Sequence, residues 1–223
     1  MFNKLCDMKL LIYSVMMLLA STCNTTETKS KQAIDTDAIQ VASENGMKRA
    51  YFASGCFWCV EEIYEGVKGV KESISGYSGG HTENPTYEDS NTGRTGHAEA
   101  NEIIYNPKIV SFKTLVNVYF ASQNIGQVNG QGPDNGSQYR SILFYQNDIE
   151  KKIIEDKIAD LTKEGYKVAA EVKPFQKFWI AEDYHQDYAK LHPTQGYIRG
   201  VSIPRFKNFA SKMPNIIKES APH

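Results

Sequence analysis

Two cysteines three residues apart, Cys56 and Cys59, follow a glycine and are separated by two large aromatic residues, Phe57 and Trp58. A thiol at the start of a helix meets unpaired backbone N–H groups and the positive end of the helix dipole, and both favour the reactive thiolate. Cysteines at positions i and i+3 on one helical turn can also close a disulfide. The pattern therefore indicates thiol chemistry, which can take several forms.

Three kinds of site compete for this pair of cysteines. A zinc site needs two more Cys or His ligands at matching spacing, and the other cysteines, Cys6 and Cys23, lie far upstream. A thioredoxin-like pair usually encloses non-aromatic residues, whereas two aromatics favour a substrate pocket beside a nucleophile and its resolving thiol. A structural disulfide is the plain alternative in an exported protein.

The composition supports one folded domain. The chain has 223 residues, of which 41% are hydrophobic and 23% charged, close to ordinary globular usage. A formal net charge of −1 leaves no basic surface for a nucleic-acid backbone, so nucleic acid is excluded as a partner.

The amino-terminal region predicts export. Residues 10–20 form an uncharged apolar run after Lys4 and Lys9, too short to span a bilayer and typical of a secretory signal over residues 1–22. Cys23 follows in a context similar to a bacterial lipoprotein cleavage site, where the cysteine is lipidated; an ordinary cleaved signal is the alternative. We expect a periplasmic or membrane-tethered protein.

Two further boundaries follow from the same region. Translation from Met8 would give a cleaner signal than translation from residue 1, because Asp7 is unusual before the apolar run. Residues 23–46 are polar and without apolar periodicity, which predicts a flexible tether.

The folded part is expected to be a single catalytic domain over 47–209, followed by a tail over 210–223. Strands are predicted at 48–53, 72–77, 98–105, 141–145 and 168–173, and helices at 56–64 and after the capping residues Ser111 and Asp148. Residues 77–96 are expected to form a long loop, and the chain beyond Phe175 to be mostly irregular. The predicted fold class is α+β, a mixed sheet packed with helices in a two-layer sandwich.

Several sequence blocks resemble the A-type peptide-methionine sulfoxide reductases in order and spacing. The blocks are Gly55-Cys56-Phe57-Trp58, Asn84-Pro85-Thr86-Tyr87, Thr95-Gly96-His97-Ala98-Glu99-Ala100, Gln131 to Ser141 and Ala181 to Gln186. The resemblance covers roughly Met47 to Val201. It implies an α+β sandwich that reduces the S epimer of methionine sulfoxide, free or in proteins, and so repairs oxidised proteins.

The resemblance also implies roles for individual residues. Cys56 is the nucleophile, and Glu99 is the acid that protonates the sulfoxide oxygen; strand alternation places Glu99 on the face of apolar Ile103, which would keep the carboxyl protonated. Tyr87 and Tyr139 match residues that hydrogen-bond the oxygen.

Three further residues complete the implied site. Asp134 matches a residue that arranges the site, and Phe57 and Trp58 would enclose the substrate methyl group. The resemblance assigns Tyr184 and His185 to structural support.

One departure from the family concerns recycling. Many relatives carry cysteines near the carboxyl terminus, where this chain has Gly196-Tyr197-Ile198. Cys59 is then the candidate resolving thiol: a Cys56 sulfenic acid would condense with it to a disulfide that an external thioredoxin-like dithiol reduces. We expect a monomer with no bound cofactor and no metal. The rival functions are a non-catalytic binding domain and a general disulfide oxidoreductase.

Overall fold

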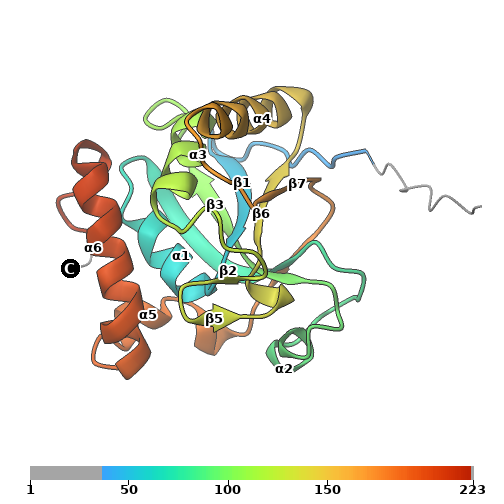
Figure 1. The fold of residues 1–223 in the computed structure, drawn as a ribbon, viewed down its shortest axis with the longest axis vertical. Helices are drawn as coiled ribbons and strands as arrows, with labels where there is room; N and C mark the ends of the chain where they lie inside the picture. The colour runs from blue at the N-terminus through green and yellow to red at the C-terminus, as the bar shows by residue number, and fades with distance from the viewer. Residues whose placement is uncertain (1–36, 222–223) are drawn as a thin grey trace, which may run out of the picture. The chain divides into compact units, whose positions relative to one another are not determined.

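The computed structural model describes residues 37–221, and its centre is a mixed sheet (Figure 1). Six strands lie in the order β7-β6-β1-β3-β2-β8, with β6 and β7 parallel and the other neighbours antiparallel. Their bounds are β1 Lys48–Ser54, β2 Val70–Ser78, β3 Ala98–Tyr105, β6 Ser141–Tyr145, β7 Glu171–Pro174 and β8 Phe178–Ile180. A separate two-stranded ribbon consists of β4 (Gly130–Gln131) and β5 (Asp134–Asn135).

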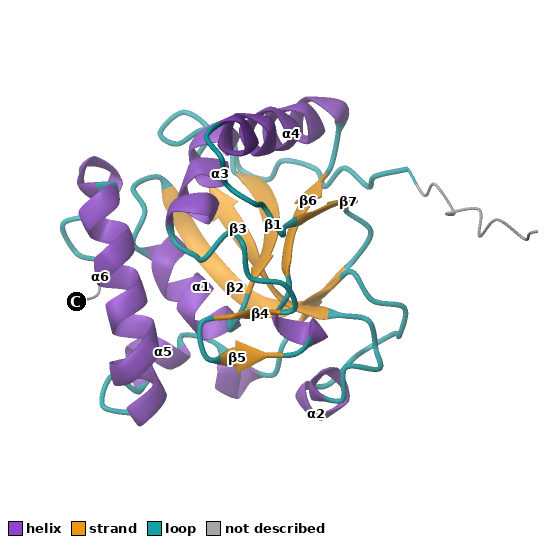
Figure 2. Cartoon of the chain, viewed as in Figure 1, coloured by secondary structure: helices purple, strands orange, loops and turns teal. Residues whose placement is uncertain are grey.

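The helices gather around this sheet, with α1 and α6 beside it and α3 and α4 above it in Figure 2. Their bounds are α1 Phe57–Glu65, α2 Tyr87–Asn91, α3 Phe112–Ala121, α4 Asp148–Lys163, α5 Tyr188–Leu191 and α6 Ile203–Lys212. Short 3-10 turns are η1 (Ser137–Tyr139), η2 (Asp183–His185) and η4 (Pro214–Ile216), and η3 (Ile198–Ser202) is a π-helical turn.

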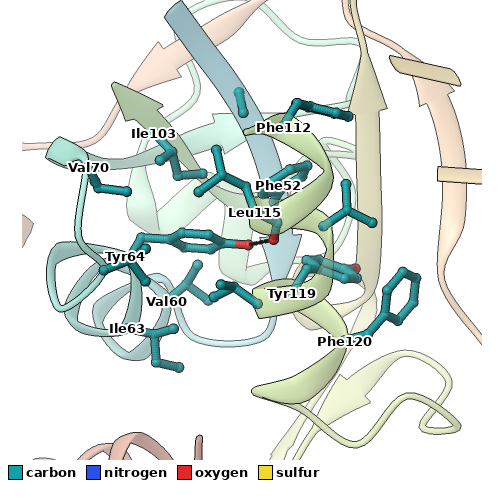
Figure 3. Packing of buried hydrophobic residues seen from close by; sticks show 14 of the residues in the cluster. Phe52, Val60, Ile63, Tyr64, Val70, Ile103, Phe112, Leu115, Tyr119 and Phe120 are labelled. Atoms are coloured by element: carbon teal, nitrogen blue, oxygen red, sulfur yellow. Dashed lines mark hydrogen bonds between the residues drawn. The ribbon is translucent and has the colours of Figure 1, made fainter. Parts of the chain in front are cut away.

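The main core lies between the sheet and four helices (Figure 3). Helical spacing turns one stripe of each helix inward, while β1 contributes Ala50 and Phe52. The helix residues are Val60, Ile63 and Tyr64 of α1, Leu115, Val116 and Tyr119 of α3, Ile154 and Leu161 of α4, and Phe206 and Phe209 of α6. This core fixes the position of α1, and with it the position of the two cysteines.

The opposite face of the sheet has its own smaller core. Alternation along β1 turns Tyr51 and Ala53 to this side, where the Tyr51 ring stacks on Phe175 with centroids 3.7 Å apart. Ile39 in the segment before β1 donates its N–H to the Phe175 carbonyl over 2.8 Å. Residues from 37 onward, expected to belong to the tether, therefore run along the domain.

The structure corrects several local expectations. The chain after Phe175 is not mostly irregular, because it forms β8, α5 and α6. The long loop contains α2, which Thr86 and Asp89 cap reciprocally. Asn147 rather than Asp148 caps α4. The last predicted strand begins three residues later than expected and spans Glu171–Pro174. The boundary expected at 209 lies inside α6.

The predicted signal, Met8 and Cys23 lie outside the described residues. Between residues 37 and 221, no helix combines the length and apolar character needed to cross a membrane.

Candidate active site

The site begins at the turn between β1 and α1. Cys56 is the N-cap residue of α1 and is 6% exposed. Gly55 makes the turn with φ of +75°, and a Cβ atom there would lie 2.4 Å from the Cβ of Gln131. Glycine is therefore needed at position 55 for both its backbone conformation and its lack of a side chain.

Glu99 reaches the same helix end from the sheet. It lies on β3, is 2% exposed, and its Oε2 accepts a 2.9 Å hydrogen bond from the backbone N–H of Phe57. Burial raises the pKa of the Glu99 carboxyl to about 8, although the hydrogen bond opposes this. A carboxyl that is mostly protonated at neutral pH thus lies beside the residue that follows Cys56.

The two thiols are free and buried, and they influence each other. Burial raises the pKa of Cys56, and Cys59 and Glu99 act in the same direction. The pKa of Cys59 is lowered to about 7, first by a hydrogen bond from Cys56 and, against the effect of burial, by the positive charge of Arg205. The helix end was expected to favour a thiolate at Cys56, but burial and the neighbouring Cys59 and Glu99 raise the pKa of this thiol instead.

Aromatic side chains form one wall of the site. The Phe57 ring is buried 4.9 Å from the His185 ring and 6.4 Å from the Tyr87 ring, centroid to centroid. Half-buried Trp58 stacks on Tyr188 with centroids 3.9 Å apart and an interplanar angle of 12°. Phe57 and Trp58 thus lie in an apolar cluster that suits a thioether methyl group.

Tyr87 and Tyr139 come from separate segments, α2 and η1. Both are half-buried. Burial raises the pKa of each phenol, and the nearby charges of Glu99 and Cys56 raise it further. Two protonated hydroxyls therefore stand near Glu99 and Cys56, where they can donate to an oxygen atom.

Asp134 lies across the site from the thiols and is joined to them by Tyr197. The Tyr197 hydroxyl donates a 2.5 Å hydrogen bond to Asp134 Oδ2, and Cys59 Sγ lies 3.8 Å from the same hydroxyl. Burial raises the pKa of Asp134, and the bond from Tyr197 opposes this rise. Sequence analysis treated position 197 only as the neighbour of a missing cysteine and so did not recognise this residue.

Glu182 and His185 support the aromatic wall from behind. Glu182 accepts 2.9 Å hydrogen bonds from the backbone N–H of Tyr87 and from the Tyr77 hydroxyl. The Trp58 indole N–H donates to His185 Nδ1 over 3.2 Å. This hydrogen bond agrees with the structural role expected of His185. Tyr184, for which the same role was expected, is 56% exposed. The Ala181 to Gln186 block was the signal that could have identified Glu182.

The structure thus gathers the predicted residues around the start of α1: Cys56, Phe57, Trp58, Cys59, Tyr87, Glu99, Asp134 and Tyr139. Among the described residues, one cluster of three carboxylates could hold a cation: Glu61, Glu65 and Asp187. Both oxygens of Glu61 already accept hydrogen bonds, from Ser75 Oγ and from the backbone N–H of Asp187 over 2.5 Å. This group is explained by its own contacts and gives no metal assignment.

Comparison with known proteins matches most of the chain to one family. The family model described as peptide methionine sulfoxide reductase matches residues 48–216. The peptide methionine sulfoxide reductase MsrA of Saccharolobus solfataricus is 43% identical over 173 residues, which cover 77% of this chain and 98% of that protein. MsrA of Pasteurella multocida is 42% identical over 172 residues, covering 77% and 99%.

Solved structures agree with the fold. Methionine sulfoxide reductase A of Corynebacterium diphtheriae superposes with a TM-score of 0.62 at 29% identity, over 72% of this chain and 84% of that one. The reduced form of Mxr1 from Saccharomyces cerevisiae gives a TM-score of 0.64 at 30% identity, over 70% and 91%. The expected α+β fold is confirmed.

Proposed function

The chain belongs to the peptide methionine sulfoxide reductase family, and from this premise we propose that its active site reduces the S epimer of methionine sulfoxide, free or in proteins, with Cys56 as the nucleophile. The protein is a thiol-dependent oxidoreductase that repairs oxidised methionine. The observation that carries the assignment of the site is the pairing of Cys56 with Glu99 at one helix end, because Glu99 accepts the Phe57 N–H over 2.9 Å. Each sulfoxide epimer requires its own enzyme.

The first step needs a nucleophile and an acid together. A sulfoxide oxygen is a poor leaving group until it is protonated, so the Cys56 thiolate attacks sulfur while Glu99 donates a proton to the oxygen. Tyr87 and Tyr139 donate hydrogen bonds to that oxygen. The S–S bond formed by the attack and the substrate S–O bond then break as the oxygen bonds to Cys56 Sγ, so methionine leaves with the sulfur electron pair and Cys56 becomes a sulfenic acid.

The second step uses Cys59. Its sulfur attacks Cys56 Sγ, an S–S bond forms, the S–O bond breaks, and the oxygen leaves as water. The support is proximity, since the two residues share the first turn of α1 and the Cys59 N–H lies 3.2 Å from the Cys56 carbonyl oxygen. An external thioredoxin-like dithiol then reduces the disulfide, and the cycle requires no bound cofactor.

The aromatic cluster explains substrate choice. Phe57 and Trp58 receive the terminal methyl group, and Asp134 arranges the polar side of the site. A methyl group in this cluster, an oxygen held by two tyrosines and a sulfur atom open to attack by Cys56 fix the handedness of the sulfoxide, which selects one epimer.

Turnover of the two enantiomers of methyl p-tolyl sulfoxide tests the proposal. With dithiothreitol as reductant, we expect the protein to reduce the S sulfoxide, and Cys56→Ser to lose all but a few per cent of the activity while it stays folded. Equal reduction of both enantiomers would contradict the epimer assignment. Failure to reduce either, with insulin disulfides reduced instead, would favour a general disulfide oxidoreductase; no turnover of any kind would favour a binding domain.

For localisation, we propose an exported protein that is lipidated at Cys23. The support is the short apolar run at 10–20 after two lysines and the residues just before Cys23. Mass spectrometry of the native amino terminus is the test, with Cys23→Ser as the unlipidated control. An unmodified chain that starts at residue 1 or 8 and fractionates with the cytoplasm would exclude both signal and anchor.

A further inference from the structure

Cys59 sits at a place where α1 packs against the carboxyl-terminal segment. It is 1% exposed, and its sulfur faces η3, α6 and the residue before η3 rather than solvent. A resolving thiol in such a position cannot lose its proton directly to water. Because the thiolate is the attacking form, some protein group must accept that proton.

A chain of two short contacts leads from Cys59 to a carboxylate. Cys59 Sγ lies 3.8 Å from the Tyr197 hydroxyl oxygen, with the thiol as donor, and this distance is within the range of hydrogen bonds to sulfur. The same hydroxyl donates to Asp134 Oδ2 over 2.5 Å. Donor and acceptor therefore alternate in one direction, from thiol to phenol to carboxylate.

We propose that Tyr197 and Asp134 form a proton relay that ionises Cys59 for its attack on the Cys56 sulfenic acid. The inference rests on the function proposed above and extends it to a residue that the sequence did not indicate. In the relay, the Cys59 proton moves to the Tyr197 oxygen while the Tyr197 proton moves to Asp134 Oδ2. Tyr197 is unchanged by the transfer, and Asp134 ends protonated.

The remaining chemistry balances with groups already in the site. The Cys59 thiolate attacks Cys56 Sγ, the S–S bond forms, and the S–O bond breaks. Glu99 regains a proton from solvent after methionine leaves, and it passes this proton to the departing hydroxide, which leaves as water. Proton exchange with solvent then restores Glu99 and Asp134 for the next cycle.

Other groups around Cys59 fit this role. Arg205 on α6 supplies a positive charge that stabilises the thiolate; its guanidinium donates to Ser122 O and Ser54 Oγ, each over 2.8 Å. Among the described residues, Arg205 has no carboxylate within ion-pair distance. Its charge is thus available to Cys59.

Three other groups face Cys59. Ser202 on η3 hydrogen-bonds Cys59, which lowers the pKa of this thiol, and its hydroxyl donates to Glu62 Oε2 over 2.5 Å. Cys56 and Glu99, at the start of α1 and on β3, are the reacting partner and the acid. Burial raises the pKa of Asp134, which makes this carboxylate a stronger proton acceptor.

A single-turnover experiment without reductant separates the two steps. The reduced protein is mixed with saturating methionine (S)-sulfoxide, then acid-quenched and alkylated; methionine release reports the first step, and loss of alkylatable Cys59 reports the second. We expect Tyr197→Phe to lower the ratio of the second rate to the first by about tenfold or more at pH 7. The Cys56 thiol that lowers the pKa of Cys59 in the reduced pair has become a sulfenic acid by this step, so without the relay Cys59 would ionise like an ordinary thiol, of which only a few per cent is thiolate at this pH. Dimedone should label the accumulating sulfenic acid.

The pH profile distinguishes a relay from a purely structural effect. The defect of Tyr197→Phe should shrink to about threefold or less by pH 9.5, where hydroxide ionises Cys59 without help. Asp134→Asn, which keeps a hydrogen-bond acceptor but takes no proton, should show the same profile of the ratio. Tyr166→Phe removes the hydroxyl of an exposed tyrosine outside the site and should leave the ratio unchanged.

The outcomes separate the relay from the proposed function. A normal burst of methionine with an unchanged ratio in both Tyr197→Phe and Asp134→Asn from pH 6 to 9.5 would overturn the relay alone. A defect that is equally large at every pH would also overturn it. Absence of methionine from the wild-type protein would overturn the proposed function and the relay with it.

Discussion

The Oε2 atom of Glu99 lies 2.9 Å from the backbone nitrogen of Phe57 and accepts its hydrogen bond, so the proposed acid is attached to the first residue of the helix that Cys56 caps. One of the unpaired N–H groups of that helix end is thereby satisfied by the acid. Asn101, two residues further along β3, donates to the Phe57 carbonyl over 3.2 Å. A shift of the strand would therefore move acid and nucleophile together.

Replacement of Glu99 by glutamine should slow the chemical step without abolishing the site. The amide oxygen can still accept the Phe57 N–H, but the side chain donates no acidic proton, so the single-turnover rate should fall by about two orders of magnitude. Glu102→Gln is the matched control, because Glu102 lies on the same strand and binds the Tyr51 hydroxyl on the other face. An unchanged rate in Glu99→Gln would place the acid elsewhere.

The buried carboxyl should also make stability depend on pH. Burial raises the pKa of folded Glu99 to about 8, so the folded state binds a proton that the unfolded state releases near pH 4.5. The contribution of this group to the free energy of unfolding is therefore greatest below pH 4.5 and declines as pH rises to about 8, by about 5 kcal/mol.

Urea unfolding at several pH values measures this dependence. The free energy of unfolding of Glu99→Gln should decline less between pH 5 and 8 than that of the wild type. Glu61, whose pKa burial also raises to about 8, is present in both proteins, so the difference isolates Glu99. Parallel curves for the two proteins would show that Glu99 is ionised in the folded state.

Replacement of Cys59 by serine should separate one turnover from many. The first methionine should appear at a nearly normal rate, after which the protein should stall with thioredoxin as reductant and accumulate a sulfenic acid that dimedone labels. Small thiols should restore part of the turnover, since they attack the sulfenic acid directly. Undiminished multiple turnover with thioredoxin as sole reductant would mean that Cys56 is recycled without Cys59.

Glu182 should act on the reaction through Tyr87. The two carboxylate oxygens of Glu182 accept hydrogen bonds from Tyr87 N–H and from the Tyr77 hydroxyl, each over 2.9 Å. In Glu182→Gln one of these oxygens is replaced by an NH2 group, so one of the two donors loses its acceptor. We expect kcat/KM to fall roughly tenfold, the scale of one lost hydrogen bond to a charged group. Glu83→Gln, an exposed change in the loop before α2, should have no effect; equal values for the two variants would refute positioning by Glu182.

The turn before Cys56 should not tolerate a side chain. Gly55 and Gly132 both have positive φ, +75° and +60°, but a Cβ atom at 55 would lie 2.4 Å from Gln131 Cβ, whereas nothing lies within 4 Å at 132. Alanine at either position should lower the free energy of unfolding by about 1 kcal/mol through backbone strain. Gly55→Ala should lower it by about 1 to 3 kcal/mol more because of the clash. Thermal unfolding of both variants measures the difference, and equal costs would remove the clash as a cause.

Local sequence patterns predicted the elements whose burial follows a simple period. The strands at β1, β3 and β6 and the helices α1 and α3 appear where alternation and helical spacing placed them, since each turns one regular face to the core. The segment after Phe175 was missed because its elements are short. There, β8 pairs with β2 about a hundred residues earlier, and α6 buries only Phe206 and Phe209.

The sequence by itself determined that two thiols lie at the start of α1 and that Glu99 lies on the apolar face of β3, because both depend on residues close together in the chain. Tertiary structure alone decided that Tyr197 reaches Asp134 and Cys59, and that burial raises the pKa of Cys56 while that of Cys59 is lowered. These features depend on packing between segments far apart in the chain and on burial. Local periodicity carries no information about which distant side chains meet, or about how much water remains around them once they do.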